Sequence, residues 1–197
     1  MLGIFLDTET NGLNPRKHCV LEIALQIVDV MDGRVLESFE SVIKISSEEW
    51  SRSDPDSLQV NGFTWDETLK GSSAPAVSDK ICALFARHKI KRGEAVFICQ
   101  NPSFDRVFFS QLIDPDKQEK LQWPYHWLDL ASMYWARALH KAAHGQGLFP
   151  WETGLSKDKI ARAEHLPPEQ QPHRAMNGVK HLLQCYTAVV GFPKTSH

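Results

Sequence analysis

The sequence has no excess of basic residues and no strong charge of either sign. Its 197 residues include 22 Lys and Arg against 24 Asp and Glu, which gives a formal net charge of −2. A protein that coats nucleic acid without sequence preference depends on a broad positive field, so this balance argues against that class. It does not exclude an enzyme that meets a phosphate backbone through metal ions.

The sequence also lacks paired cysteines and long hydrophobic runs. No C-x-x-C spacing occurs among its four cysteines, which are Cys19, Cys82, Cys99 and Cys185. Scattered thiols are typical of a reducing compartment. The apolar run near Met1 has no basic start and is too short for a signal peptide or a membrane span. We therefore expect a cytoplasmic protein that does not contact a membrane.

What the sequence does contain is an ordinary globular composition, with 42% hydrophobic and 23% charged residues. The length suffices for one domain with a substantial core. We find no internal repeat and no low-complexity segment. The prediction is a single domain over residues 1–192, followed by a disordered tail over 193–197.

The order of apolar segments predicts an α/β domain. Segments 2–6, 20–30 and 35–45 are predicted strands of an antiparallel meander, with an Asp-Gly turn before the third. Residues 46–70 and 145–154 are predicted loops, the first with short helical pieces, and 95–99 is a further strand. Helices are predicted at about 73–88, 101–112, 129–138, 156–163 and 174–190. Strands that alternate with helices in this way predict a mixed central sheet covered by helices on both faces.

Two of the predicted helices have an apolar stripe that we expect to be buried. In the helix that Asn101-Pro102 opens, Pro115 lies just past the predicted end. Its stripe comprises Phe104, Val107, Phe108 and Leu112. In the last helix the stripe comprises Val179, Leu182, Leu183, Tyr186 and Val190.

The first apolar strand leads into two acidic residues, Asp7 and Glu9, separated by Thr8. Side chains alternate along a strand, so both carboxylates leave the same face, with their Cα atoms ~6.5–7 Å apart. Two carboxylates at this spacing repel each other, so ionising both costs free energy unless a cation lies nearby. Paired oxygen ligands suit a hard ion such as Mg²⁺ or Mn²⁺. For an isolated pair, a solvated acidic turn would be the better interpretation, so the metal hypothesis depends on partners elsewhere.

Two later residues are candidate partners. Asp105 lies in the first turn of a predicted helix, where the helix dipole favours a carboxylate even without a ligand. However, junctions between strands and helices in α/β sheets are also where ligands gather. His173 lies just before the last predicted helix. A single histidine at a helix start is more often a surface or capping residue than a catalyst.

Taken together and in this order, three segments resemble the motifs of the DEDDh family of 3′-to-5′ exonucleases. The segments are Asp7-Thr8-Glu9, Asn101 to Asp105, and His173-Arg174-Ala175. The family includes the proofreading epsilon subunit of bacterial DNA polymerase III, and the resemblance spans residues 4–185. It implies an RNase H-like fold, two divalent metal ions and a nucleic-acid partner bound at a single-stranded 3′ end.

The resemblance also implies roles for individual residues. Asp7, Glu9 and Asp105 would hold the Mg²⁺ or Mn²⁺ ions, and His173 would act as general base, since an imidazole can accept a proton near neutral pH. The residues expected to contact the substrate are Thr8, Thr10 and Asn101. The resemblance leaves open whether the polymer is DNA or RNA, and whether the chain docks onto a polymerase or forms a homodimer.

One family position departs from the pattern. The family places an Asp five residues after the histidine, where this chain has Gly178, and no Asp or Glu occurs between Arg174 and His197. We therefore expect an exonuclease weakened by the loss of its fourth acidic ligand. The alternative is a catalytically degenerate exonuclease fold that binds nucleic acid or serves as a scaffold. On this reasoning, Gly178→Asp should supply the missing ligand and raise activity.

Overall fold

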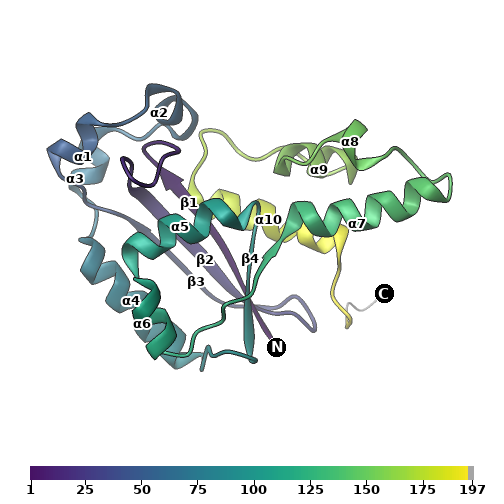
Figure 1. Ribbon diagram of the computed structural model, residues 1–197, viewed down its shortest axis with the longest axis horizontal. Helices are drawn as coiled ribbons and strands as arrows, with labels where there is room; N and C mark the ends of the chain where they lie inside the picture. The colour runs from purple at the N-terminus through teal and green to yellow at the C-terminus, as the bar shows by residue number, and fades with distance from the viewer. Residues whose placement is uncertain (195–197) are drawn as a thin grey trace.

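A five-stranded mixed sheet forms the centre of the computed structural model, which describes residues 1–194 (Figure 1). The strand order is β3-β2-β1-β4-β5. The strands are β1 (Leu2–Thr10), β2 (Val20–Asp29), β3 (Val35–Val42), β4 (Ala95–Cys99) and β5 (Trp127–Asp129). The first three form the predicted antiparallel meander, whereas β4 pairs in parallel with β1 and β5 in parallel with β4.

The helices follow the strands and cover the sheet. They are α1 (Ser47–Ser51), α2 (Pro55–Asn61), α3 (Trp65–Leu69), α4 (Ala74–Arg87), α5 (Pro102–Leu112), α6 (Pro115–Lys120), α7 (Leu130–Ala143), α8 (Pro150–Thr153), α9 (Lys157–Ala163) and α10 (Ala175–Val189). In Figure 1, α4 and α6 lie to the left of the sheet and α7, α8 and α9 to the right. Side-chain caps set several starts: Asp129 accepts the N–H groups of Ala131 and Ser132 at the first turn of α7.

Alternation along β1 divides the core into two layers. Ile4 and Leu6 are fully buried in one apolar cluster, together with residues of α4 and α5. Phe5, between them, is buried in a second cluster with residues of α7, α9 and α10, where its ring meets Tyr186 edge-on at a centroid distance of 5.2 Å. The expected mixed sheet with helices on both faces is therefore confirmed. Because side chains alternate, Asp7 leaves β1 on the same side as Phe5, toward α10.

Several predicted boundaries were wrong. β1 does not end at Leu6 but continues to Thr10, because β2 still pairs with it there, opposite Val20. Pro115 does lie just past the end of α5, as predicted, but it is also the first residue of a helix that was not predicted, α6, with Asp114 as the side-chain cap. The loop predicted over 145–154 contains the short helix α8, which also begins with a proline, Pro150. Proline suits the first helical turn because its missing N–H would have no partner there.

Two residues predicted to be buried are half exposed. Val107 is 45% exposed because Phe104 and Phe108 turn their own side of α5 to the core. Val190 is 49% exposed, since α10 ends at Val189 before the predicted boundary.

The end of the chain is described only in part. Of the predicted tail 193–197, residues 195–197 lie outside the described residues. The main-chain N–H of Lys194 donates to the Met31 carbonyl at 2.8 Å. Among residues 1–194, no helix combines the length and apolar character that crossing a membrane requires.

Candidate active site

A polar cavity of about 280 Å³ lies where β1 and β4 run toward their C-terminal ends. The structure brings together in it all four residues predicted as metal ligands and base. These come from β1, from the first turn of α5, and from the segment before α10. The lining residues are Asp7, Thr8, Glu9, Gln100, Asn101, Phe104, Asp105, Ser156, Lys157, Asp158, Glu169 and His173.

Asp7 and Glu9 share one face of β1 and are largely shielded from water. The side chain of Asp7 is 16% exposed, and Glu9 is buried. Burial raises the pKa of Glu9 to about 8, and the negative charges of Asp7 and Glu169 add to the shift. Burial also raises the pKa of Asp7, although the Lys157 ammonium opposes this effect. The pair therefore needs a nearby positive charge for both carboxylates to be ionised at neutral pH.

Asp105 lies in the same cavity, although it is 97 residues from Thr8 in the sequence. The paired register of β1 and β4 ends at Phe5, so the β1 edge beyond it is open to another partner. There, Asp105 Oδ1 accepts both the main-chain N–H of Thr8 at 3.0 Å and its hydroxyl at 2.8 Å. These bonds fix the orientation of a carboxylate that is 3% exposed. Burial, followed by the charge of Asp7, raises the pKa of Asp105 well above its usual range.

The predicted substrate residues lie at or beside the cavity, but much of their hydrogen-bonding capacity serves the fold. Both donors of Thr8 bind Asp105, as described above. The Thr10 hydroxyl donates to the Gly12 carbonyl at 2.9 Å, and its own carbonyl accepts from the Asn61 side chain at 3.0 Å. Their substrate contacts stay predictions.

Asn101 precedes α5, but its side chain makes no capping hydrogen bond to that helix. It adopts a left-handed backbone with φ of 56°, which asparagine tolerates better than most residues. Its side-chain carbonyl accepts from the Ser103 hydroxyl at 2.7 Å, and its main-chain N–H donates to Asp129 at 3.0 Å. It lines the cavity, and its predicted role in substrate binding is likewise open.

A residue of β2 holds the start of α10 in place. Glu22 faces Glu9 in the strand register, and its carboxylate accepts the N–H of Ala175, the first residue of α10, at 2.8 Å. A carboxylate at a helix N-terminus is favoured by the helix dipole. This tertiary cap fixes the two α10-linked positions that the family resemblance singled out, His173 and Gly178, relative to the acids of β1.

Gly178 lies directly against Asp7. A Cβ atom at this position would stand 2.0 Å from Asp7 Oδ2 and 3.1 Å from Lys157 Nζ. Residue 178 therefore faces the acids, as the family pattern implies, but a side chain there has no room unless Asp7 moves. This geometry argues against the expectation that Gly178→Asp simply adds a ligand, because the new side chain would first have to displace Asp7.

Lys157, the first residue of α9, places a positive charge beside Asp7 and Gly178. Its ammonium lies 2.9 Å from Glu169 Oε2, 3.6 Å from Asp7 Oδ1 and 3.3 Å from the Gly178 carbonyl, to which it donates. The side chain is only 12% exposed. Burial by itself would lower the pKa of Lys157, but Asp7 and Glu169 outweigh it and hold the pKa above its ordinary value. The group is therefore an ammonium ion at neutral pH.

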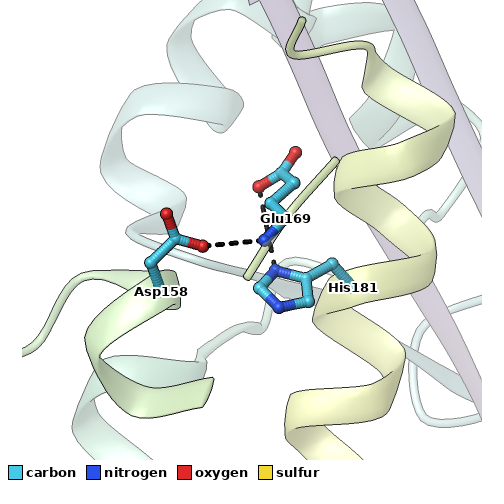
Figure 2. A group of neighbouring side chains, drawn as sticks. All are labelled: Asp158, Glu169 and His181. Atoms are coloured by element: carbon cyan, nitrogen blue, oxygen red, sulfur yellow. Dashed lines mark hydrogen bonds and ion pairs between the residues drawn. The ribbon is translucent and has the colours of Figure 1, made fainter. Parts of the chain in front are cut away.

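Glu169 anchors this lysine from the loop before His173. Its side chain is 2% exposed, and its Oε1 lies 3.8 Å from Nδ1 of His173. Figure 2 shows it between Asp158, which accepts its main-chain N–H at 3.0 Å, and His181, whose Nδ1 lies 3.8 Å from Oε2. Burial would raise the pKa of Glu169, but His181 and Lys157 lower it to about 2.

The three residues of Figure 2 are close enough to share a metal ion, with ligand atoms within 4.8 Å of one another. However, Nε2 of His181 already faces the Pro167 carbonyl at 2.9 Å. The Cys185 thiol and the Glu169 carboxylate raise the pKa of His181 to about 10. A doubly protonated imidazole has no lone pair for a metal, so this group serves to hold Glu169 ionised.

Lys157 and Glu169 are the two residues of the cavity whose importance the sequence did not reveal. Lys157 lies at the start of the helix predicted at about 156–163, and Glu169 follows a pair of prolines. Neither position carries a motif, and the two come together only when α9 packs near α10.

The comparisons with known proteins agree with this geometry. Residues 4–186 match a family model described as Exonuclease. Ribonuclease T of Shewanella denitrificans is 26% identical over 131 residues, which cover 62% of this chain and 55% of that protein. Ribonuclease T of Haemophilus ducreyi is 28% identical over 116 residues, covering 57% and 54%. The chain thus spans about half the length of the curated relatives it matches.

Solved structures confirm the predicted RNase H-like fold. The zinc-bound complex of E. coli exonuclease I with single-stranded DNA superposes with a TM-score of 0.71 at 17% identity, over 96% of this chain and 40% of that one. Another structure of exonuclease I gives a TM-score of 0.70 at 17% identity, over 96% and 41%. At this level of identity the likeness concerns the fold.

Proposed function

Because the chain belongs to the exonuclease family, we propose that it hydrolyses phosphodiester bonds one by one from the 3′ end of single-stranded nucleic acid, with a divalent metal ion. The observation that carries this proposal is the convergence of Asp7, Glu9, Asp105 and His173 in one cavity. These residues come from three distant parts of the chain, and each is placed by its own strand or helix junction. The named relatives, Ribonuclease T and exonuclease I, support the same reaction class.

The donor set of the cavity fits Mg²⁺ or Mn²⁺. Asp7, Glu9 and Asp105 supply only hard carboxylate oxygens, and burial disfavours their ionised forms until a cation compensates them. These three residues would hold the ion. When bound, a divalent ion supplies an acidic water and compensates the negative charge of the phosphate.

The remaining steps belong to the chain itself. His173 is 29% exposed at the cavity wall and would accept the proton of the attacking water. Glu169, whose Oε1 lies 3.8 Å from Nδ1 of His173, would orient that ring. Asp105 is fixed by its two bonds from Thr8, so its carboxylate does not have to reorganise when the substrate binds.

An adjoining cavity of about 320 Å³ offers a place for the terminal nucleotide. It shares Thr8, Glu9 and Phe104 with the acidic cavity and adds the apolar side chains of Leu13 and Val60. If the base of the terminal nucleotide lies in this second cavity, its phosphate would point toward the carboxylates of the first. Phe104 is half-buried, so part of its ring is available for stacking on a base.

The proposal is tested with single-stranded DNA and RNA oligonucleotides that carry a label at the 5′ end. With Mg²⁺ or Mn²⁺ we expect a ladder of products shortened from the 3′ end, and none with EDTA. Asp7→Asn should abolish the ladder, whereas Asp66→Asn, an exposed carboxamide substitution in α3, should not.

The same assay separates the alternative function. Gly178 and Lys157 in the acidic cavity are the observations that favour a degenerate domain, because they replace a ligand and introduce a resident cation. A degenerate binding protein would retain the labelled oligonucleotide in a gel-shift experiment with either metal and release no products. Metal-dependent shortening from the 3′ end would exclude this alternative.

A further inference from the structure

We propose that the ammonium of Lys157 takes the place of one of the two cations expected in this family, so that the active site binds a single divalent ion. This inference rests on the proposed function and specifies how the site is built. Lys157 lies outside all of the family motifs. We assign to its ammonium the positive charge that a metal ion, bound by an acid at position 178, would otherwise supply.

The position of the ammonium carries the argument. A side chain at residue 178 would begin 3.1 Å from Lys157 Nζ, so the ammonium stands where a ligand at that position would bring its cation. It is surrounded by oxygen atoms from Asp7, Glu169 and the Gly178 carbonyl, at 3.6, 2.9 and 3.3 Å. Three oxygens around a buried cation resemble the donor set of a metal, at distances suited to an ammonium group.

The charges of the cavity lead to the same conclusion. Lys157 acts electrostatically on four carboxylates of the cavity, those of Asp7, Glu9, Asp105 and Glu169. A fifth, Asp158, also lines the cavity and accepts the main-chain N–H of Glu169. Lys157 and one divalent ion together compensate three of these four negative charges. A second divalent ion beside Asp7 would be repelled by the ammonium, which Glu169 holds nearby in a buried ion pair at 2.9 Å.

Glu169 links the Lys157 ammonium to the proposed base. It balances Lys157 and, four residues before His173, also lies 3.8 Å from the imidazole of the proposed base. Asp158 fixes its main chain by accepting its N–H, and His181 lies 3.8 Å from its carboxylate. The lysine and its counter-ion therefore form a built cation site beside the three acids, and the position of the base is tied to it.

The test counts Mn²⁺ ions, so it does not depend on activity. Isothermal titration and electron paramagnetic resonance are applied to the metal-free full chain, to Lys157→Met, to Lys157→Arg and to the exposed control Lys180→Met on α10. We expect one Mn²⁺ in the wild type, in Lys157→Arg and in Lys180→Met. We expect two in Lys157→Met, because Asp7, Glu169 and the Gly178 carbonyl become available to a second ion.

Two bound ions in the wild type would overturn the inference, and so would a folded Lys157→Met protein that binds only one. Circular dichroism establishes that each variant is folded, and the wild-type count stands independently of any variant. One Mn²⁺ without degradation of an oligonucleotide would refute the proposed nuclease activity, whereas two ions with full degradation would refute only the single-ion site. No Mn²⁺ at all would refute both.

Discussion

Replacing Gly178 by alanine should damage the active site far more than the fold. The new Cβ would lie 2.0 Å from Asp7 Oδ2, whereas ordinary contact begins near 3.4 Å. The difference, about 1.4 Å, is the distance by which the Asp7 carboxylate must retreat, because Gly178 lies in the interior of α10 and its backbone is fixed. Asp7 Oδ2 is the atom that the new Cβ would meet first, so the displacement falls on this carboxylate.

The magnitudes separate the two effects. A displacement of ~1 Å at a reacting centre costs on the order of 100-fold in rate. For stability, alanine in a helix interior is favoured over glycine by ~1 kcal/mol, whereas overpacking costs ~1–3 kcal/mol. Because the clash involves the end of a side chain and not the backbone, we expect the free energy of unfolding to change by less than ~2 kcal/mol.

The measurement is the initial rate of degradation of a labelled oligonucleotide, combined with urea unfolding of the same samples. Asn177→Ala is the matched control, since it also places alanine in α10, one residue from Gly178. It should leave the rate near that of the wild type. Gly178→Asp should be as inactive as Gly178→Ala, for the same steric reason. A folded Gly178→Ala protein with the wild-type rate would refute the argument, because it would show that the observed position of Asp7 does not matter.

Three other properties of the site can be measured in the same protein. In the metal-free form the pKa of Glu9 is raised to about 8, from ~4.3 in an unfolded chain. Protonation of Glu9 therefore stabilises the fold at low pH, and this contribution to the free energy of unfolding is lost as pH rises through 8. Thermal unfolding in EDTA should therefore show lower stability at pH 9 than at pH 6, and Glu9→Gln should reduce the difference; an unchanged difference would contradict the assignment. His173→Ala should lower the rate by ~10²–10⁴-fold without changing the affinity for Mn²⁺ in calorimetry, as expected of a base and not of a ligand. Thr8→Val removes a buried hydrogen bond to the Asp105 carboxylate and should lower the free energy of unfolding by ~1.5–3 kcal/mol in urea, whereas Thr8→Ser should retain it.

The sequence predicts elements well where local signals agree. The meander of β1 to β3 has strong apolar patterning and an Asp-Gly turn, and α9 begins within one residue of the start predicted at 156. β5 was missed because it has three residues, one of them the 38% exposed Leu128, and exists through pairing with the edge of β4. A strand of this kind has no signal in its own sequence, since its stability comes from the neighbouring strand.

The site divides in the same way. The acids and the histidine occupy motif positions, so the order and spacing of residue types are enough to identify them. The cap that fixes α10 could not be identified, because it comes from Glu22, 153 residues away. Lys157 belongs to a helix for which the sequence predicts only its extent, about 156–163. Its place beside Asp7 depends on how α9 packs near α10.

The glycine at position 178 and the two charged residues beside it, Lys157 and Glu169, are therefore parts of one arrangement. An acid missing at position 178 leaves a volume to be filled and one ligand fewer for a cation. The Asp7 carboxylate occupies the volume, at a distance that only glycine permits. The Lys157 ammonium supplies the positive charge of the cation that this acid would have helped to bind, and Glu169 compensates that ammonium. These groups depend on one another. Restoring the acid at position 178 by itself would fill the space that Asp7 occupies, but the Lys157 ammonium would still compete with a metal ion. The sequence of the last helix is therefore not sufficient to judge whether the site is active.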